Sequence, residues 1–249
     1  MTILDASPET TLHLDPEALP RHVAIIMDGN RRWAKQNHLP AELGHWEGAK
    51  ILTEIVQTAA ECGIKTLTVY AFSTENWARP QEEIDSLMGL FEIYLETKRE
   101  TMVKEGIHLN TIGDLSRLPL NVRRALQETK AATEHCKKIN LVLALNYGGR
   151  DEIKRAVGRI LMENEKKKIL PEDLSEEFIA QYLDTTPWGD PDLLIRTGGE
   201  MRLSNFMLWQ VSYTEFYVTD VFWPQFTRQN FFQALHVYQT RQRRYGGTL

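Results

Sequence analysis

The sequence predicts an α/β fold: one domain in which helices flank a six-stranded, mainly parallel sheet. Six short apolar runs recur along the 249 residues, and helical patterns lie between them. Alternation of strands and helices through a whole chain is typical of a parallel sheet covered by helices. No repeat, linker or low-complexity tract divides the chain. We therefore expect a single domain over residues 21–249, preceded by a loose, flexible polar arm over residues 1–20.

Each predicted strand is a nearly continuous run of β-branched and leucine residues. Runs of about four to eight such residues suit strands that are buried on both faces of a sheet. In chain order, the predicted strands are 23–27, 64–72, 107–112, 139–145, 192–196 and 216–221.

The predicted helices alternate with these strands. In 45–62, apolar residues at helical spacing share one face, and Gly63 follows as a C-cap. In 81–105, an acidic first turn precedes an apolar stripe. The stripe consists of Leu87, Met88, Phe91, Tyr94 and Leu95. Further helices are predicted over 118–137, 149–166, 175–183 and 228–244.

Composition disfavours several classes of protein. The formal net charge is −5, whereas a general nucleic-acid binder usually has a basic surplus, so we expect no nucleic-acid partner. The only cysteines, Cys62 and Cys136, match neither a metal site nor a redox motif, which predicts buried thiols in a reducing compartment. The N-terminal segment does not resemble a signal peptide, and no apolar run approaches the ~20 residues of a membrane span. These features predict a cytoplasmic protein.

Polar and glycine-rich stretches follow the predicted strands at their carboxyl ends. They are Asp28-Gly29-Asn30, Ser73 to Trp77 with Arg79 close behind, Gly113-Asp114, Asn146 to Arg150, Thr197 to Glu200, and Arg202 to Ser204. Ligands of an open parallel sheet bind beyond the carboxyl ends of the strands, so we expect these stretches to meet at one edge. Taken singly, each has an ordinary interpretation: a turn for Asp-Gly-Asn and for Gly-Gly, a core position for Trp77, and a surface or capping position for His45.

The charges near the strand ends favour an anion site. The residues concerned are Arg32, Arg79, Arg196, Arg202, Asp28 and Glu215. Two like unit charges ~4 Å apart repel by ~4 kcal/mol at an effective dielectric constant of about 20, so converging arginines require an anion. A diphosphate matches guanidinium forks. A carboxylate in such a site suits Mg²⁺, which binds oxygen donors and keeps substrate phosphate in its shell. We therefore expect Asp28 to hold Mg²⁺ and the arginines to hold diphosphate.

Other phosphate-handling classes lack their motifs here. The chain has no G-x-x-x-x-G-K-[ST], which disfavours a P-loop nucleotidase, and no G-x-G-x-x-G after the first strand, which disfavours a dinucleotide-binding oxidoreductase. An aspartyl-phosphate phosphatase would need a nucleophilic aspartate two residues before Asp28, where the chain has Ile26. The paired aspartate-rich motif of all-helical trans-prenyl synthases is also absent.

Five stretches, taken together and in this order, are highly specific. They are HVAIIMDGNRRWAK, YAFSTENWARP, NYGGRDEI, DLLIRTGGEMRLSNFMLWQ and YTEFYVTDVFWP. On these motifs the chain, from about Pro20 to Gly247, resembles the cis-prenyltransferases, and within them the bacterial undecaprenyl diphosphate synthases. The resemblance implies an enzyme that condenses isopentenyl diphosphate onto an allylic diphosphate, typically farnesyl diphosphate, with a cis double bond formed in each round. The implied product is undecaprenyl diphosphate, the lipid carrier for cell-wall synthesis.

The resemblance also implies roles for individual residues. Asp28 coordinates Mg²⁺ and assists departure of the starter's diphosphate, and Glu215 is a second metal-linked carboxylate. His45, Asn76 and Ser73 form the rest of the catalytic group, with Asn76 and Ser73 as candidates for proton handling. The substrate-binding residues are Gly29, Asn30, Arg31, Arg32, Trp33, Trp77, Arg79, Arg196, Arg202, Ser204, Arg244 and Gly246, of which Arg196, Arg202 and Ser204 match the isopentenyl diphosphate site. The family is generally homodimeric, and Arg244 and Gly246 resemble an arm that reaches the partner's active site.

A long product requires an apolar tunnel. Burial stabilises a chain by ~0.8 kcal/mol per CH₂, or ~4 kcal/mol per five-carbon unit. The stripe on 81–105 is a candidate wall, although each of its residues equally suits an ordinary core face. The resemblance places Ile139 at the tunnel floor, where a large residue limits chain length. Release of such a product implies transient, peripheral membrane contact.

Two positions depart from the family's pattern. Ala41 stands where relatives usually carry an arginine four residues before His45, so one diphosphate contact is missing. Met201 stands where some relatives have a histidine that can approach the metal. The alternative to an enzyme is a non-catalytic accessory subunit of a cis-prenyltransferase complex. Such a subunit is expected to lose the metal aspartate and the strand-end asparagine, whereas Asp28 and Asn76 are present.

Overall fold

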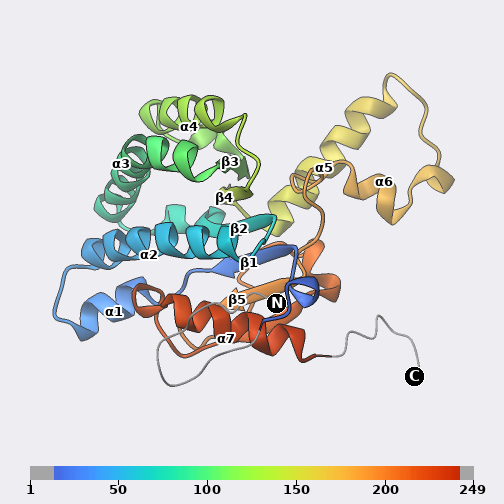
Figure 1. The fold of residues 1–249 in the computed structure, drawn as a ribbon. Helices are drawn as coiled ribbons and strands as arrows, with labels where there is room; N and C mark the ends of the chain where they lie inside the picture. Colours follow the sequence, from blue (N-terminus) through green and yellow to red (C-terminus); the bar gives the residue numbers. More distant parts are fainter. Residues whose placement is uncertain (1–13, 242–249) are drawn as a thin grey trace.

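The sheet has six strands, and every neighbouring pair of them is parallel. The computed structural model describes residues 14–241 (Figure 1). The strands are β1 (His22–Ile26), β2 (Thr66–Ser73), β3 (Ile107–Ile112), β4 (Ile139–Tyr147), β5 (Leu193–Arg196) and β6 (Glu215–Val218), in the order β3-β4-β2-β1-β5-β6. All six predicted strands are confirmed. We expected a mainly parallel sheet, and every described pair of neighbouring strands is parallel.

The predicted helices are also present: the one predicted over 81–105 has the predicted bounds, the one predicted over 45–62 begins four residues earlier, and the other four are shorter. The helices are α1 (Asn30–Gln36), α2 (Ala41–Glu61), α3 (Gln81–Glu105), α4 (Leu120–Thr133), α5 (Gly149–Asn164), α6 (Glu176–Ala180) and α7 (Arg228–Gln239). The sequence did not predict α1, because Asp-Gly-Asn indicated only a turn. Gly29 makes the tight entry to α1: its φ is 110°, and a Cβ there would lie 2.8 Å from the Phe222 ring.

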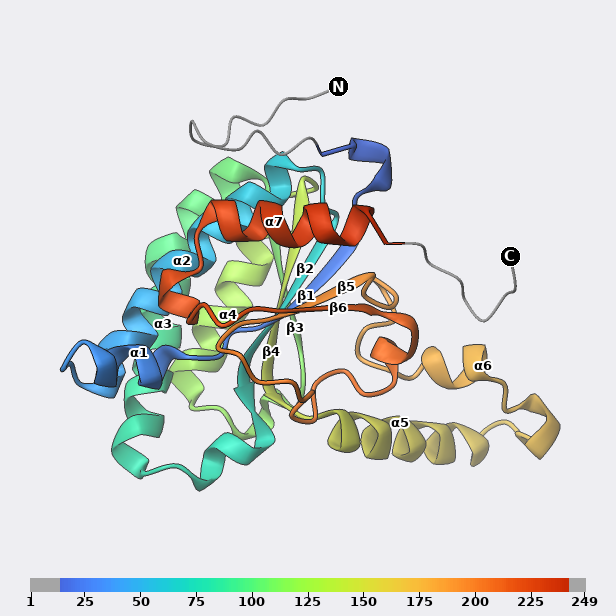
Figure 2. The same cartoon turned by 90° about the horizontal axis from the view of Figure 1, so that it is seen from below.

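The two faces of the sheet are covered differently. Helices α2, α3, α4 and α7 pack over one face, above the larger hydrophobic core (Figure 2). Along β1, Val23 and Ile25 face this core, while Ala24 and Ile26 face the other side. On that side a smaller cluster, which includes Phe206 and Met207, packs against the sheet. The α5 and α6 helices project from the body on this side (Figures 1 and 2).

The order of the strands positions the site. From β1 the chain crosses to β2 on one side, while β5 lies on the other side of β1, so the strand order reverses between β1 and β5. Ligands of open α/β sheets bind at such a switch point, beyond the carboxyl ends of the strands. Ile26 at the end of β1 is in register with Arg196 at the end of β5. The segments after these two residues therefore meet, although they are far apart in the sequence.

The described part of the predicted N-terminal arm is packed against the body. Leu14 is buried in the larger core. A short 3-10 turn, η1 (Pro16–Ala18), follows, and the Asp15 N–H donates a 3.0 Å hydrogen bond to the Gln239 side chain on α7. Residues 1–13 lie outside the described residues.

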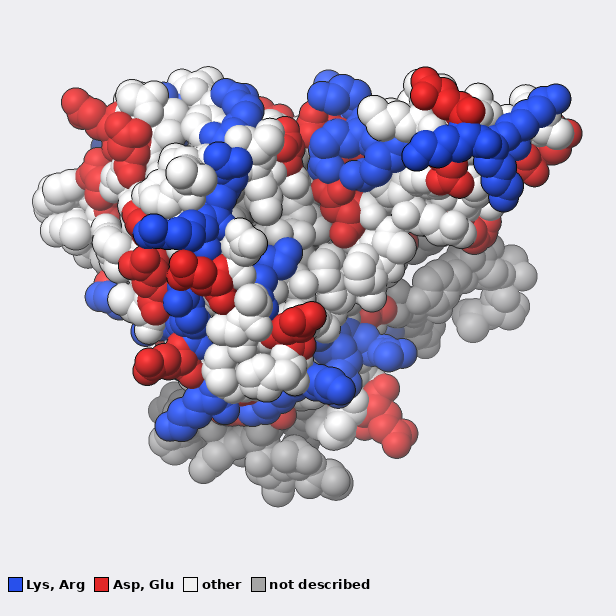
Figure 3. Space-filling model, turned by 90° about the horizontal axis from the view of Figure 1, so that it is seen from above, with Lys and Arg blue, Asp and Glu red and all other residues white. Residues whose placement is uncertain are grey.

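The surface seen in Figure 3 carries mixed charge. Lysine and arginine side chains are interspersed with aspartate and glutamate on this face, and no single basic patch covers it. This distribution agrees with the formal net charge of −5.

Both cysteines are buried free thiols, as predicted. Burial raises the pKa of Cys62 to about 12, and it also raises the pKa of Cys136. The reactive form of cysteine is the thiolate, so both side chains are unreactive at neutral pH.

A buried histidine on β1 makes stability depend on pH. The Nδ1 of His22 lies 3.1 Å from the Gly189 carbonyl, which can only accept, so Nδ1 carries the proton and Nε2 accepts from the Thr68 hydroxyl at 2.8 Å. Burial lowers the pKa of His22 from 6.5 to about 4. Between these values the unfolded chain binds a proton that the folded chain does not, so stability falls as the pH drops below 6.5.

We expect His22 to lower the free energy of unfolding by about 2 kcal/mol when the pH falls from 7 to 5. His22→Gln, which does not titrate, should lose correspondingly less of its free energy of unfolding over the same range. Urea denaturation of both proteins at pH 7 and pH 5 measures the difference. Equal pH dependence of the parent and the variant would contradict this account.

Candidate active site

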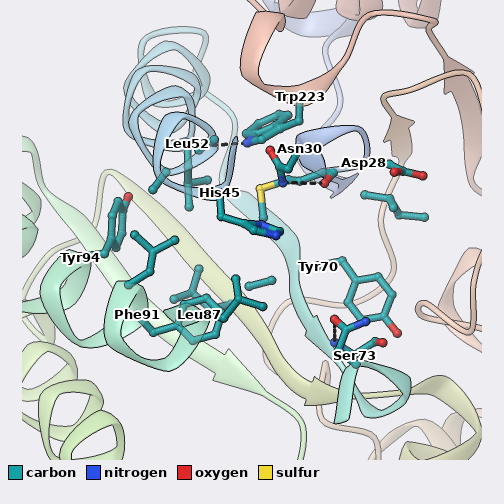
Figure 4. A pocket seen from close by; sticks show the side chains of 18 of the residues that line it. Asp28, Asn30, His45, Leu52, Tyr70, Ser73, Leu87, Phe91, Tyr94 and Trp223 are labelled. Atoms are coloured by element: carbon teal, nitrogen blue, oxygen red, sulfur yellow. Dashed lines mark hydrogen bonds between the residues drawn. The ribbon is translucent and has the colours of Figure 1, made fainter. Parts of the chain in front are cut away.

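A cavity of about 280 Å³ lies at the carboxyl ends of β1, β2 and β5, beneath α2 and α3. Its polar lining includes Asp28, Asn30, His45, Ser73, Asn76, Arg79, Arg196 and Ser204. Its apolar lining includes Leu52, Leu87, Leu90, Phe91, Tyr94 and Leu143. Figure 4 shows the two kinds of lining at opposite sides, with Asp28 and Ser73 at one side and Leu87, Phe91 and Tyr94 at the other. The cavity can therefore hold a molecule with a charged head and an apolar tail.

Asp28 lies at the polar end and is held by two arginines. Its Oδ2 accepts a 2.7 Å hydrogen bond from Arg196, and its Oδ1 lies 3.0 Å from Nη2 of Arg32. Burial alone would raise the pKa of Asp28, but the hydrogen bonds from Arg196 and Arg32 outweigh it and lower that pKa. Its main chain is anchored as well, because the carbonyl accepts from Trp223 N at 3.0 Å and from the Thr197 hydroxyl at 2.7 Å. Asp28 is thus a fixed, ionised carboxylate.

Arg196 connects Asp28 to the loop after β5. Its side chain is only 4% exposed, and its Nη1 donates to the Ser204 hydroxyl at 3.0 Å and to the Arg202 carbonyl. Its Nε is buried without a hydrogen-bond partner among the described residues. A buried guanidinium with a free N–H is suited to an anionic ligand. By contrast, the Arg202 side chain is 61% exposed and pairs with Glu200, so it lies at the rim.

Asn30 adds a second unused polar atom to this end. Its Nδ2 donates to the Met27 carbonyl at 3.4 Å, while its Oδ1 is buried without a partner among the described residues. Helix α2 has a glycine opposite this oxygen, because a Cβ on Gly48 would lie only 2.6 Å from it. Two of the predicted site residues, Arg196 and Asn30, therefore present unused hydrogen-bonding atoms in this region.

A cluster around Glu83 forms another part of the polar wall. Arg79 donates to Glu83 Oε1 at 3.0 Å, and Arg31 lies 3.7 Å from its Oε2. His45 Nε2 lies 3.7 Å from Oε1. Burial and the nearby Arg79 lower the pKa of His45, so this imidazole is neutral at physiological pH. The sequence analysis missed Glu83: it belongs to the acidic first turn of 81–105, which indicated only a favourable helix dipole.

The turn after β2, η2 (Thr74–Ala78), presents Asn76. The Asn76 Oδ1 accepts from Ser73 N at 3.1 Å, and both residues line the cavity. Trp77 is not among the residues that line it: its indole N–H donates to Asn146 at 2.8 Å, and Arg117 lies 4.7 Å above its ring. Trp33 on α1 is also not among the lining residues.

Comparison with known proteins identifies the family. The family model described as "Putative undecaprenyl diphosphate synthase" matches residues 26–246. The chain belongs to this family.

Curated relatives and solved structures agree with this assignment. The chain is 50% identical over 229 residues to the isoprenyl transferase of Geobacillus kaustophilus (92% of this chain, 89% of the relative). It is 48% identical over 234 residues to that of Chlamydia pneumoniae (92% and 94%). Among solved structures, it resembles lavandulyl diphosphate synthase from Lavandula x intermedia in complex with dimethylallyl diphosphate, with a TM-score of 0.90, 38% identity, and coverage of 92% and 99%. It also resembles a probable undecaprenyl diphosphate synthase from Campylobacter jejuni, with a TM-score of 0.77, 37% identity, and coverage of 91% and 98%.

These likenesses show that the chain is a prenyltransferase of isoprenoid diphosphates, with the α/β fold of that family. None of the helices in residues 14–241 is long and apolar enough to cross a membrane.

In this prenyltransferase, Glu215 lies far from Asp28 within one chain. Glu215 begins β6 in register with Leu193, which is itself in register with Val23 near the start of β1. Asp28 follows the opposite end of β1, five residues beyond Val23, or roughly 16 Å along the strand direction at ~3.3 Å per residue. Glu215 instead pairs with Arg241 at 2.8 Å. Its predicted role near the metal stays a prediction, as does that of Arg244 and Gly246, which lie outside the described residues.

The residues at the polar end of the site are compatible with a Mg²⁺ ion that would be held jointly with a substrate diphosphate. Within residues 14–241, no group of three or more His, Cys, Asp or Glu side chains could hold a metal by itself. Mg²⁺ is usually bound through one or two carboxylates and substrate phosphates, with waters completing its shell. Asp28 supplies one ionised carboxylate, and the unused Oδ1 of Asn30 can accept a hydrogen bond from a metal-bound water.

The two departures from the prenyltransferase pattern have different settings. Met201 is 88% exposed and is not among the residues that line the cavity. Ala41 is the first residue of α2, four residues before His45. His45, Ala49 and Leu52 line the cavity, and helical spacing places Ala41 on the same face of α2. An arginine at this position would therefore be directed toward the polar end of the site.

Ala41→Arg is expected to lower the Michaelis constant for farnesyl diphosphate by about tenfold, because a charge-assisted hydrogen bond is worth ~1.5–3 kcal/mol. The constant for isopentenyl diphosphate should change little. Steady-state kinetics with each substrate varied separately measure both, and Ala41→Met serves as an uncharged control of similar length. A starter constant that stays flat or rises would show that position 41 does not contact the diphosphate.

Proposed function

We propose that this prenyltransferase condenses isopentenyl diphosphate onto farnesyl diphosphate, adds further units in the cis configuration, and makes long-chain undecaprenyl diphosphate for cell-wall synthesis. The observation that carries the proposal is the cavity itself, where an arginine-held carboxylate faces an apolar lining of Leu87, Phe91 and Tyr94. An allylic diphosphate has the same division into charged head and apolar tail.

Each diphosphate has its own set of residues in this proposal. The starter's diphosphate lies against Asp28, Arg32 and the start of α1, and that of isopentenyl diphosphate lies against Arg196 and Ser204, with Arg202 at the rim. Arg32 and Arg196 neutralise Asp28 in the structure, so both guanidiniums are oriented before a substrate arrives. A Mg²⁺ ion held by Asp28 and the diphosphate oxygens would supply positive charge for the departing diphosphate.

The condensation also releases a proton from isopentenyl diphosphate. Ser73, Asn76 and His45 are polar residues that line the cavity. The neutral imidazole of His45 can accept a proton, and its Nε2 is buried without a hydrogen-bond partner among the described residues. Ser73 and Asn76 can relay one by hydrogen bonding.

The tail of the growing product occupies the apolar part of the cavity. The predicted wall residues Leu87, Phe91 and Tyr94 line it, and Leu90 joins them. The other two members of the predicted stripe, Met88 and Leu95, are buried but are not among the lining residues. Ile139 is also not a lining residue, but it lies on β4 on the same side of the sheet as the lining residue Leu143, four residues nearer the start of the strand. An extended tail would grow along β4 toward it.

Ile139→Ala is therefore expected to shift the products to longer chains, because removing three carbons from a packed floor opens space for further units. Chromatography of the dephosphorylated products measures the distribution. Ile112→Ala, on β3 but facing the opposite side of the sheet, is a matched large-to-small control that should leave product length unchanged. An unchanged distribution in Ile139→Ala would mean that another residue sets the length.

The proposal includes a homodimer and transient membrane contact. The α5 helix projects from the body and exposes Val157, Leu161 and Met162, an apolar group suited to a second copy of the chain. A tail stabilised by ~4 kcal/mol per five-carbon unit in an apolar site leaves more readily into a bilayer than into water.

The direct test is incubation of the purified protein with farnesyl diphosphate, labelled isopentenyl diphosphate and Mg²⁺, followed by chromatography of the products. Long cis-polyprenyl products support the proposal. No chain elongation, or elongation only from a different starter, would contradict it. Light scattering of the same sample gives the oligomeric state.

A further inference from the structure

The loop from Arg202 to Met207 is held in an unusual backbone conformation. Ser204, Asn205 and Met207 have φ angles of 49°, 64° and 47°. Such left-handed angles are uncommon for residues other than glycine, although asparagine tolerates them well. The contacts of the loop with its surroundings must stabilise this shape.

Asn205 makes three hydrogen bonds that join this loop to two other segments. Its main-chain carbonyl accepts from Gly149 N at 2.7 Å, and its Oδ1 accepts from Arg150 N at 2.9 Å, both at the start of α5. Its Nδ2 donates to Glu75 Oε1 in η2 at 2.8 Å. A backbone N–H can only donate and a carboxylate can only accept, so these partners together determine the orientation of the amide.

The three segments are packed closely at this point. A Cβ on Gly148 would lie 2.6 Å from Nδ2 of Asn205 and 2.6 Å from the Thr74 hydroxyl. Position 148 therefore requires glycine for Asn205 and η2 to approach one another. Glu75 is ionised in this setting: burial opposes ionisation, but the hydrogen bond from Asn205 contributes to a net lowering of its pKa.

The turn η2 and the Arg202–Met207 loop, which Asn205 joins, carry different parts of the site. Glu75 lies in η2 directly before Asn76, which lines the cavity. Asn205 directly follows Ser204, whose hydroxyl accepts from Arg196 and whose carbonyl accepts from the Tyr70 hydroxyl at 3.3 Å. A shift of η2 relative to the loop would change the distance between Asn76 and Ser204.

We propose that Asn205 is a positioning residue, which latches η2 to the Arg202–Met207 loop through Glu75 and so sets the position of Asn76 relative to the isopentenyl diphosphate site. The inference rests on the proposed function. No contact of Asn205 with substrate is required, since it acts through Ser204 and through the turn that carries Asn76.

An exchange of the two side chains tests the latch. Asn205→Asp keeps the oxygen that accepts from Arg150 but places a second carboxylate against Glu75, so it breaks only the contact to η2. Glu75→Gln keeps an acceptor oxygen for Asn205 and serves as the matched control. In Glu75→Gln/Asn205→Asp, the glutamine amide can donate to the aspartate, which restores the hydrogen bond in reverse.

We expect Asn205→Asp to raise the Michaelis constant for isopentenyl diphosphate about tenfold, with a smaller change for farnesyl diphosphate. The control and the double variant should remain within about threefold of the parent. A constant that does not rise in Asn205→Asp, or that does not recover in the double variant, would overturn the inference.

Hydrogen exchange without substrate provides a second readout that does not depend on the reaction. The amides of residues 73–79 should exchange faster in Asn205→Asp than in the parent, and the double variant should restore their protection. Unchanged exchange of this segment in Asn205→Asp would also overturn the latch. If the parent itself does not condense isopentenyl diphosphate onto farnesyl diphosphate, the proposed function fails. Hydrogen exchange alone then tests whether Asn205 holds η2 to the loop.

Discussion

Asp28→Ala is expected to reduce the turnover of isopentenyl diphosphate by ~10²–10³-fold, since removal of a single preorganised electrostatic contact commonly costs this much. Among the described residues that line the cavity, this carboxylate is the one acidic side chain, and two arginines hold it at 2.7 and 3.0 Å. Its loss removes the oxygen ligand that would fix Mg²⁺ against the starter's diphosphate. Single-turnover and steady-state rates of the purified variant measure the effect.

The alanine variant needs a folding control, because it leaves the buried Arg196 without its carboxylate partner. Asp28→Asn keeps the size of the side chain and a hydrogen-bond acceptor while removing the charge. We expect it to melt close to the parent and still to lose most of its activity. Turnover within about threefold of the parent in both variants would show that Asp28 does not serve the departing diphosphate.

Arg196→Gln is expected to lower kcat/KM for isopentenyl diphosphate by ~10²-fold or more. Loss of one partner of a buried, hydrogen-bonded charge pair weakens ligand binding by ~2–5 kcal/mol, and ~1.4 kcal/mol corresponds to a factor of ten. Arg196 is 4% exposed and contacts Asp28, the Ser204 hydroxyl and the Arg202 carbonyl. One substitution is therefore expected to disturb both of the proposed diphosphate sites.

Arg202→Gln is the matched comparison on the same loop. Its side chain is 61% exposed and pairs with Glu200 at the surface, where ion pairs contribute ~0–1 kcal/mol. We expect kcat/KM for isopentenyl diphosphate to fall by about tenfold or less, through a higher Michaelis constant for that substrate alone. A larger loss in Arg202→Gln than in Arg196→Gln would mean that Arg202 swings inward and carries the main contact.

Much of the fold was predictable because its signals are local. The six strands are runs of apolar residues, and the stripes of α2 and α3 repeat at helical spacing, so each could be recognised within one window of sequence. The short helix α1 could not, because its seven residues begin at Asn30, inside an Asp-Gly-Asn stretch that is also a common turn. Its existence depends on the close approach of Gly29 to Phe222, a contact between residues far apart in the chain.

The membership of the site was partly predictable for the same reason. Polar residues at strand ends indicate an edge, and Asp28, Asn76, Arg196 and Ser204 do line one cavity there. The cavity does not include Trp33 or Trp77 among its lining residues, and Glu215 lies at the other end of the sheet. Glu215 directly precedes the predicted strand 216–221, so the strand pattern itself already placed it at the amino end, and only the family resemblance assigned it to the metal site.

The sequence alone therefore determined most of the strands and helices and the edge of the sheet where the cavity lies, because burial periodicity and turn residues act over a few positions. Only the tertiary structure decided the partners: Arg196 with Asp28, Arg79 with Glu83, and Trp77 with Asn146. Each guanidinium could satisfy any nearby carboxylate. Which one is near depends on the order and register of strands, and these are set by packing between distant segments, such as those of Asp28 and Arg196, 168 residues apart.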